Sequence, residues 1–266
     1  AWTRKLLLPE TAIDSWRRWD AGLNERPVLL GPLSGGRSNR SFLLDSGNKK
    51  LVLRLNAAGT FLPGDSRRDE TGIWQSASHE GIAPPLLYAD EGSRFLVSLY
   101  IENGLPGQPP YDEEYMRQAI DLLRRCHQLE YDATSIDYAG HIDHYWQMIG
   151  KKNRLSNPAL FEQRGPMQSV LNSLINSDAP MGLCHHDPVV ANFIGNNERL
   201  YLIDWEYAAK GLLVMDYAAI GVEWEMDFRL LSELTGFRTD ALVAAEKIYR
   251  YLCDLWQEAT TNDVNP

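Results

Sequence analysis

The stretch LCHHDPVVANFIGNNERLYLIDWEYA, Leu183 to Ala208, places three polar side chains of the ligand type among apolar neighbours. Asp187, Asn192 and Asp204 are each flanked by residues typical of buried strands. His185, Asp187 and Asn192 form the pattern H-x-D-x-x-x-x-N, and Asp204 ends the strand-like segment LYLID. We expect a loop followed by a hairpin, which would bring Asn192 and Asp204 together.

These side chains are of the kind that phosphoryl transfer from a nucleotide requires. That reaction needs a carboxylate to orient the attacking hydroxyl and accept its proton, and it needs an Asn and an Asp to hold Mg²⁺ at the phosphates. Mg²⁺ prefers oxygen ligands, and two protein ligands leave room for phosphate and water. The alternative is a capped turn for Asp187 and Asn192, with Asp204 ending a strand.

The first part of the chain contains features that favour the catalytic interpretation. The segment LSGGRSNRSF, residues 33–42, lies between two predicted strands, where backbone N–H groups could cover phosphates or simply form a turn. Arg54 lies in the apolar strand LVLRLN, so we expect it to have an anionic partner, for which Glu70 is the natural candidate. The alternative for Arg54 is an edge-strand side chain that faces water.

Composition excludes several classes of function. The chain has 266 residues, 44% hydrophobic and 23% charged, which suits one large domain or two lobes. A net charge of −10 argues against a nucleic-acid partner and is compatible with a cationic substrate. Three widely spaced cysteines in no metal-ligand pattern indicate reduced core residues. Without an apolar run near ~20 residues or a signal peptide, we expect a cytoplasmic protein with no membrane association.

The hydrophobic pattern divides the chain into a β-rich part and a helical part. A segment rich in Gly and Pro, residues 103–114, separates a lobe of residues 1–102 from a lobe of residues 103–266, with a hinge near residues 98–103. The first lobe is predicted to have strands at 26–33, 40–56 (two strands) and 94–102, and helices at 13–23 and 66–82, the latter closed by Gly81. The second is predicted to have helices at 112–129, 141–152, 167–177, 216–226 and 238–259.

Five motifs, SGGRSN, LRLN, HHDPVVAN, IDWEYA and MDYAAIGVEW, give the sequence a family resemblance that runs from about Gly31 to Trp256. The chain resembles the protein-kinase-like phosphotransferases of small molecules. It is most similar to the choline/ethanolamine kinase family and its bacterial relatives, including thiamine kinases, and more distantly similar to aminoglycoside phosphotransferases. The segment IDWEYA and an Arg at position 54, where protein kinases carry Lys, resemble this branch. The resemblance implies an α+β fold, with a small antiparallel β-sheet N-lobe containing one main helix and a larger, mostly helical C-lobe.

The resemblance also implies roles for individual residues. Asp187 would be the catalytic base, Asn192 and Asp204 would bind Mg²⁺, and Asp216 and His185 would brace the catalytic loop. Arg54 would contact the nucleotide phosphates and pair with Glu70, and backbone near the hinge would hold adenine. The implied nucleotide-binding set is Ser34, Gly35, Gly36, Ser38, Asn39, Arg54, Glu70, Leu99 and Ile101.

A cationic alcohol is recognised by aromatic faces and a carboxylate. Glu223 lies where choline kinases have a substrate-contacting Glu followed by Trp. Two positions depart from the family pattern: Cys253 replaces the first Trp of a W-x-x-W pair, and Val189 replaces a polar residue beside the base. Core packing is the alternative role for each aromatic residue. The implied substrate set is Glu206, Glu223, Trp224, Phe228 and Trp256.

The sequence therefore predicts an ATP- and Mg²⁺-dependent kinase of a small cationic alcohol, of the choline/ethanolamine type or thiamine. One alternative is an aminoglycoside-type phosphotransferase. An alternative of another class is a nucleotide-binding pseudokinase that regulates a partner. The sequence leaves open the identity of the substrate, the preference for ATP or GTP, and the oligomeric state.

Overall fold

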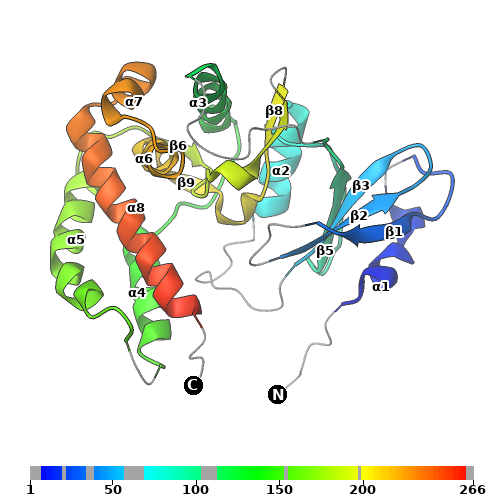
Figure 1. Cartoon of the computed structure of the whole chain (residues 1–266), viewed down its shortest axis with the longest axis horizontal. Helices are drawn as coiled ribbons and strands as arrows, with labels where there is room; N and C mark the ends of the chain where they lie inside the picture. The colour runs from blue at the N-terminus through cyan, green and yellow to red at the C-terminus, as the bar shows by residue number, and fades with distance from the viewer. Residues whose placement is uncertain are drawn as a thin grey trace. The chain divides into compact units, whose positions relative to one another are not determined.

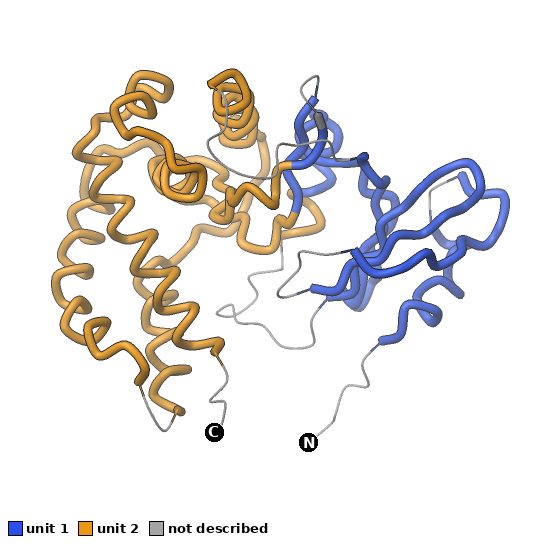
Figure 2. The backbone as a smooth tube through the Cα atoms, in the orientation of Figure 1, with its two compact units in different colours: residues 1–60, 74–105, 194–203 blue, residues 61–73, 106–193, 204–266 orange. Residues whose placement is uncertain are grey.

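The computed structural model describes residues 7–19, 22–33, 39–56, 69–102, 113–152, 155–196 and 199–261. The chain divides into two compact units that are each discontinuous in sequence (Figure 2). Unit 1 contains residues 1–60, 74–105 and 194–203, and unit 2 contains residues 61–73, 106–193 and 204–266. The predicted α+β class is confirmed, because a five-stranded antiparallel sheet is followed by a helical part.

Unit 1 is built on that sheet, whose strand order is β1-β2-β3-β5-β4 (Figure 1). Its strands are β1 Val28–Pro32, β2 Arg40–Asp45, β3 Lys50–Leu55, β4 Leu86–Ala89 and β5 Phe95–Leu99. In β3, Leu51, Leu53 and Leu55 alternate along the strand and are buried in one apolar core with Phe95 and Val97 of β5. This alternation sets the register, in which Arg54 lies opposite Ser41 on β2 and Leu96 on β5.

The helix predicted over residues 13–23 is wrong in its position. The structure has α1 at Pro9–Ile13 and a short 3₁₀ helix, η1, at Trp16–Arg18. Proline suits the first position of a helix, so the helix starts before the predicted segment. Ala12 and Ile13 then bury their side chains in the sheet core. Strand β4 was not predicted, because it has only four residues and directly follows the pair Pro84–Pro85.

Helix α2, Glu70–His79, crosses the division between the units and ends near Gly81 as predicted, with Gly81 at φ +65°. A hairpin of β7, Phe193–Asn196, and β8, Arg199–Leu202, supplies residues to unit 1 from much later in the chain. The amide of Leu202 donates to the carbonyl of Ile82 at 2.8 Å, which ties the hairpin to the segment after α2.

Unit 2 is mostly helical. Helix α8, Thr239–Thr260, packs against α4, α5, α6 and α7 through buried residues at helical spacing, such as Leu242, Ala245 and Ile248. A small antiparallel sheet pairs β6, Met181–Cys184, with β9, Ala209–Leu212. The other helices are α3 Glu113–His127, α4 Tyr138–Ile149, α5 Ala159–Ile175, α6 Leu213–Glu223 and α7 Phe228–Thr235, with 3₁₀ turns η2 Val190–Asn192 and η3 Trp205–Tyr207.

Helices α4 and α6 each begin and end three residues before their predicted ranges, and two other helices of unit 2 differ more. Helix α5 begins well before the predicted residue 167 and continues through Pro166, whose surroundings in the helix are exposed. Helix α7 was not predicted because it has only eight residues; the side chain of Asp227 caps its start and Gly236, at φ +78°, ends it. Within the described residues, no helix is both long and apolar enough to cross a membrane.

Candidate active site

The loop after β6 carries the side chains of the H-x-D-x-x-x-x-N pattern. His186 has φ +63°, a left-handed backbone conformation that turns the chain away from the direction of β6. Asp187 is the next residue after this turn. Asn192 then folds back in η2, and its Nδ2 donates to the carbonyl oxygen of Asp187 at 2.8 Å and to Asp187 Oδ2 at 2.9 Å. The structure therefore brings Asp187 and Asn192 together and fixes both by hydrogen bonds.

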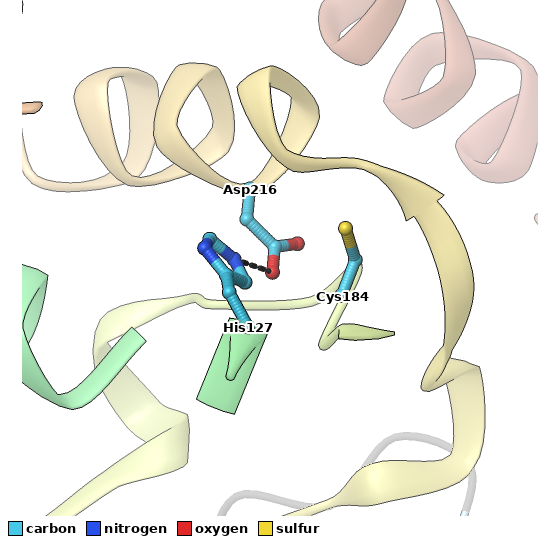
Figure 3. Close-up of side chains that lie close together, drawn as sticks. All are labelled: His127, Cys184 and Asp216. Carbon is cyan, nitrogen blue, oxygen red and sulfur yellow. Dashed lines mark hydrogen bonds and ion pairs between the residues drawn. The ribbon is translucent and has the colours of Figure 1, made fainter. Parts of the chain in front are cut away.

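Asp216, on α6, binds the backbone of this loop, and Figure 3 shows its side chain between His127 and Cys184. Its carboxylate is fully buried and accepts the amides of His185 and His186, both at 2.8 Å, and it lies 3.0 Å from Nε2 of His127. Burial alone raises the pKa of Asp216, but the hydrogen bond with His127 and the nearby imidazoles outweigh burial and lower the pKa to about 2. Asp216 is therefore an ionised anchor for the backbone that presents Asp187.

The same cluster includes Cys184, and one ligand atom each from His127, Cys184 and Asp216 lie within 4.8 Å of one another (Figure 3). A metal ion there would compete with the three N–H donors that the Asp216 carboxylate already accepts. Burial, together with the charge of Asp216, raises the pKa of the Cys184 thiol, which opposes the thiolate form that a metal requires. We therefore interpret this cluster as a support for the catalytic loop rather than as a metal site.

Asp204 lies at the end of β8 with φ +65°, and η3 follows it directly. Its charge acts on Asp187: burial first, then the Asp204 carboxylate, raises the pKa of Asp187 to about 7. The hydrogen bond from Asn192 lowers that pKa, and the carboxylates of Glu206 and Glu223 raise it further. Four carboxyl groups are thus close enough to interact at this end of unit 2.

Two of these acids come from the predicted substrate set. Glu206, in η3, is 3% exposed. Glu223 is the last residue of α6, and the phenol of Tyr249 on α8 donates to its Oε1 at 2.9 Å. The hydrogen bond from Tyr249 fixes the Glu223 carboxylate in place. The charges of both glutamates raise the pKa of Asp187.

The predicted aromatic residues lie in different surroundings. Trp224 is fully buried, its ring packs 5.0 Å from Tyr115 and 4.9 Å from Phe193, and its Nε1 donates to the carbonyl of Pro188 at 3.3 Å. Trp224 therefore supports the catalytic loop, in agreement with the packing alternative. Phe228, at the start of α7, faces Gly221 of α6, since a Cβ there would lie 3.1 Å from its ring. Trp256 is half-buried on α8 and Cys253 is exposed.

The predicted nucleotide residues that the structure describes lie mostly in unit 1. Arg54 is 6% exposed; its Nε donates to Oδ1 of Asn56 at 3.1 Å, and its guanidinium lies 5.5 Å from the ring centre of Trp74. Asn39 is buried, and the amide of Leu99 donates to the carbonyl of Pro85 at 2.9 Å at the end of β5. Ile101 is half-buried.

Glu70 is buried but belongs to unit 2, so its pairing with Arg54 stays a prediction. Ser34, Gly35, Gly36 and Ser38 lie outside the described residues.

The comparison with protein families fits this arrangement. The model of the phosphotransferase enzyme family matches residues 30–257, which is most of the chain. The chain belongs to the phosphotransferase enzyme family. The segments that carry the loop, Asp204 and Asp216 all lie inside the matched range.

This phosphotransferase is also similar to individual proteins and solved structures. Protein LicA of Haemophilus influenzae is 25% identical over 193 residues, which cover 70% of this chain and 56% of that protein. The chain thus spans little more than half of this curated relative. The crystal structure of choline kinase LicA from Streptococcus pneumoniae matches with a TM-score of 0.71 at 21% identity, covering 89% of each chain. The choline/ethanolamine kinase family protein of Mesorhizobium loti matches with a TM-score of 0.70 at 22% identity, covering 92% of this chain and 84% of that one. These structures confirm the protein-kinase-like fold.

Several polar aromatic residues of the phosphotransferase that interact with Asp187 or Glu223 were not predicted from the sequence. Tyr249 on α8 contacts Glu223, while Tyr145 on α4 and Tyr207 in η3 both interact electrostatically with Asp187 and Glu206. A signal existed on α4, because residues 138, 141 and 145 share one face at helical spacing and all three are polar aromatics. No such signal marks Tyr249, whose partner is 26 residues away on another helix.

Proposed function

We propose that this phosphotransferase transfers the γ-phosphoryl group of ATP, with Mg²⁺, to the hydroxyl of a small cationic alcohol of the choline/ethanolamine type or thiamine. The observation that carries the proposal is the charge around Asp187. Its pKa is raised to about 7, first by burial and then by Asp204, with further contributions from Glu206 and Glu223. A site that groups these acids is suited to binding cations, which in this reaction are a metal ion and a positively charged acceptor.

The donor groups beside Asp187 fit Mg²⁺. Nδ2 of Asn192 is committed to Asp187, which leaves the amide oxygen Oδ1 as the ligand atom, and Asp204 supplies a carboxylate. Both are the hard oxygen ligands that Mg²⁺ prefers. When bound at Asn192 and Asp204, Mg²⁺ supplies charge neutralisation for the nucleotide phosphates.

Asp187 is suited to handling the proton of the acceptor. Its Oδ2 accepts from Asn192, and we assign Oδ1 to the acceptor hydroxyl. As the acceptor oxygen bonds to the γ-phosphorus and the bond to ADP breaks, the hydroxyl proton passes to Asp187. A carboxylate with a pKa near the working pH can accept this proton and release it afterwards. Asp216 keeps the backbone of the loop in place, because it accepts two consecutive amides there.

Glu223 and Glu206 are assigned to the positive end of the acceptor. The hydrogen bond from Tyr249 orients the Glu223 carboxylate, so a cation would meet a fixed rather than a mobile charge. The surrounding phenols add polarisable aromatic faces. Phe228 and Trp256 stay in this assignment as predicted substrate contacts, whereas Trp224 acts through the loop that it supports.

The same proposal assigns nucleotide binding to residues 1–102 and the catalytic loop, metal site and acceptor site to residues 103–266. Arg54, with Asn39 and the end of β5 at Leu99, supports the first assignment, because a buried cation suits phosphate and a strand end offers backbone groups to adenine. Three cysteines without disulfides agree with a cytoplasmic protein, which we also propose.

A coupled ATP-consumption assay with choline, ethanolamine, thiamine and kanamycin tests the proposal. We expect turnover with one of the three small cationic alcohols, and loss of most turnover, by about 10²-fold or more, in the Asp187→Asn variant with ATP binding retained. Turnover of kanamycin alone would favour the aminoglycoside alternative. Mg²⁺-dependent ATP binding with no turnover of any acceptor would favour the pseudokinase. Full activity of Asp187→Asn would remove Asp187 from its proposed role.

A further inference from the structure

One face of α4 is directed at the acceptor side of the site rather than at the helical core alone. Tyr138, His141 and Tyr145 follow one another at helical spacing on this face, and all three are buried. Tyr138 lies 2.9 Å from Nε2 of His186, next to Asp187, and its hydroxyl accepts the amide of Leu212 at 3.1 Å. The first turn of α4 therefore contacts the catalytic loop itself.

The next two turns of α4 hydrogen-bond to each other and to η3. The Tyr145 hydroxyl lies 3.0 Å from Nε2 of His141, and the two rings are 4.9 Å apart. Tyr207 hydrogen-bonds to Tyr145, and this bond lowers the pKa of Tyr145 and raises that of Tyr207. The Tyr145 hydroxyl thus lies between His141 on its own helix and Tyr207 in η3.

His141 can accept the hydroxyl proton of Tyr145 because its imidazole is uncharged. It is 8% exposed, and burial, followed by the charges of His186 and His144, lowers its pKa to about 4, although Asp137 opposes the shift. The imidazole is thus neutral near pH 7 and keeps a lone pair for Tyr145. Its ring also stacks on Tyr207, with centres 6.3 Å apart and an angle of 13° between the planes. One histidine therefore fixes two phenols, one by a hydrogen bond and one by stacking.

Both phenols interact electrostatically with acids of the site. The carboxylates of Asp187 and Glu206 contribute to the raised pKa of each, after burial as the main cause. Their hydroxyls stay protonated, so the two rings form an uncharged aromatic wall beside the acids. Given the proposed function, we propose that His141 is a positioning residue for the acceptor and that this face of α4 sets acceptor specificity by holding Tyr145 and Tyr207.

Three variants test the proposal in the full chain, by steady-state kinetics with the acceptor that the wild-type protein phosphorylates fastest. His141→Met keeps the volume and removes the hydrogen-bond acceptor. We expect it to raise the KM of the acceptor about tenfold and to leave the KM of ATP unchanged. His141→Gln places a polar atom near the position of Nε2, so we expect its acceptor KM to stay close to that of the wild type. His79→Met makes the same change at an exposed histidine of α2 and serves as the matched control.

The outcomes separate positioning from a loss of folding. An unchanged acceptor KM in His141→Met, or equal rises in both KM values without rescue in His141→Gln, would overturn the proposal. If His141→Met does not fold, Tyr145→Phe removes the central hydroxyl and keeps the ring; it must raise the acceptor KM selectively, or the proposal fails. Absence of turnover by the wild-type chain with every acceptor would instead overturn the proposed function, and this inference with it.

Discussion

At the scale of single residues, two aspartates of unit 2 have pKa values shifted in opposite directions. Asp187 and Asp216 are both removed from solvent in large part, yet the pKa of Asp187 is raised to about 7 and that of Asp216 is lowered to about 2. The difference lies in their neighbours. Carboxylates surround Asp187, whereas N–H donors and imidazoles surround Asp216. The first arrangement suits proton transfer, and the second suits anchoring.

The first prediction concerns the stability of the cation-free protein. Because the folded-state pKa of Asp187 lies above its unfolded value, the folded chain binds more protons between about pH 4 and 7, and its free energy of unfolding falls as pH rises through that range. Asp187→Asn removes this effect. We expect the variant to melt about 5 °C above the wild type at pH 8 in EDTA, and to show a smaller gain at pH 5.

Asp216→Asn provides the matched comparison for that experiment. The folded-state pKa of Asp216 lies below its unfolded value, so its contribution to stability is present above about pH 4 and is lost as pH falls toward 2. We expect Asp216→Asn to lower the melting temperature at pH 8. Calorimetric scans of both variants check the signs; a loss of stability in Asp187→Asn at pH 8 would contradict our account of Asp187.

The sequence predicted residue positions best where the chemistry is local. The spacing of Asp187 and Asn192 indicated one loop, and the two side chains are hydrogen-bonded. Asp216 was expected to brace that loop, and it accepts two of its amides. Tyr249 was missed because its partner lies on another helix. His141 was missed although its spacing from Tyr145 on α4 was visible in the sequence, because only tertiary packing brings Tyr207 against its ring.

At the scale of elements, β9 approaches the catalytic loop closely enough to require a glycine. A Cβ on Gly211 would lie 2.5 Å from the Tyr138 hydroxyl and 2.6 Å from Nε2 of His186. Both contacts are tighter than real side chains adopt, so any larger residue displaces the hydrogen bond between Tyr138 and His186. Strand β9 thereby sets the position of the loop that β6 begins.

The second prediction follows from this contact. We expect Gly211→Ala to lower kcat about tenfold and to destabilise the fold by about 1–3 kcal/mol, because overpacking shifts His186 and the backbone next to Asp187. Gly165→Ala is the matched control, since a Cβ at Gly165 in α5 meets nothing within 4 Å. We expect that change to stabilise the helix slightly. Equal kinetics in Gly211→Ala and the wild type would show that β9 does not position the loop.

Among the elements, the long periodic segments were predicted, whereas two of the short ones were missed. Helices α3 and α8 lie close to their predicted ranges because many buried positions repeat at helical spacing. Strand β4 and helix α7 have four and eight residues, too few for a period to stand out. The predicted range of helix α5 began at residue 167, directly after Pro166, whereas the helix begins at Ala159 and Pro166 lies inside it.

At the scale of the whole molecule, the net charge of −10 acts together with the acids near Asp187. The resulting negative electrostatic potential attracts a cationic acceptor, and dissolved salt screens this attraction. The third prediction is that kcat/KM for a cationic alcohol, at saturating ATP, falls about three- to tenfold between about 20 and about 300 mM NaCl. An uncharged isostere such as 3,3-dimethylbutan-1-ol is the control for choline and should show little dependence. Equal salt dependence for the two alcohols would argue against recognition of the positive charge.

The hairpin of β7 and β8 has a consequence for biosynthesis. Unit 1 includes residues 194–203, and the amide of Leu202 bonds to the carbonyl of Ile82. The ribosome completes the five-stranded sheet long before it makes Leu202, so the nascent sheet must wait for helices α3 to α5 to be synthesised before its last partner arrives. During that interval the Ile82 carbonyl lacks this donor, and co-translational folding of unit 1 cannot finish until most of unit 2 has left the exit tunnel.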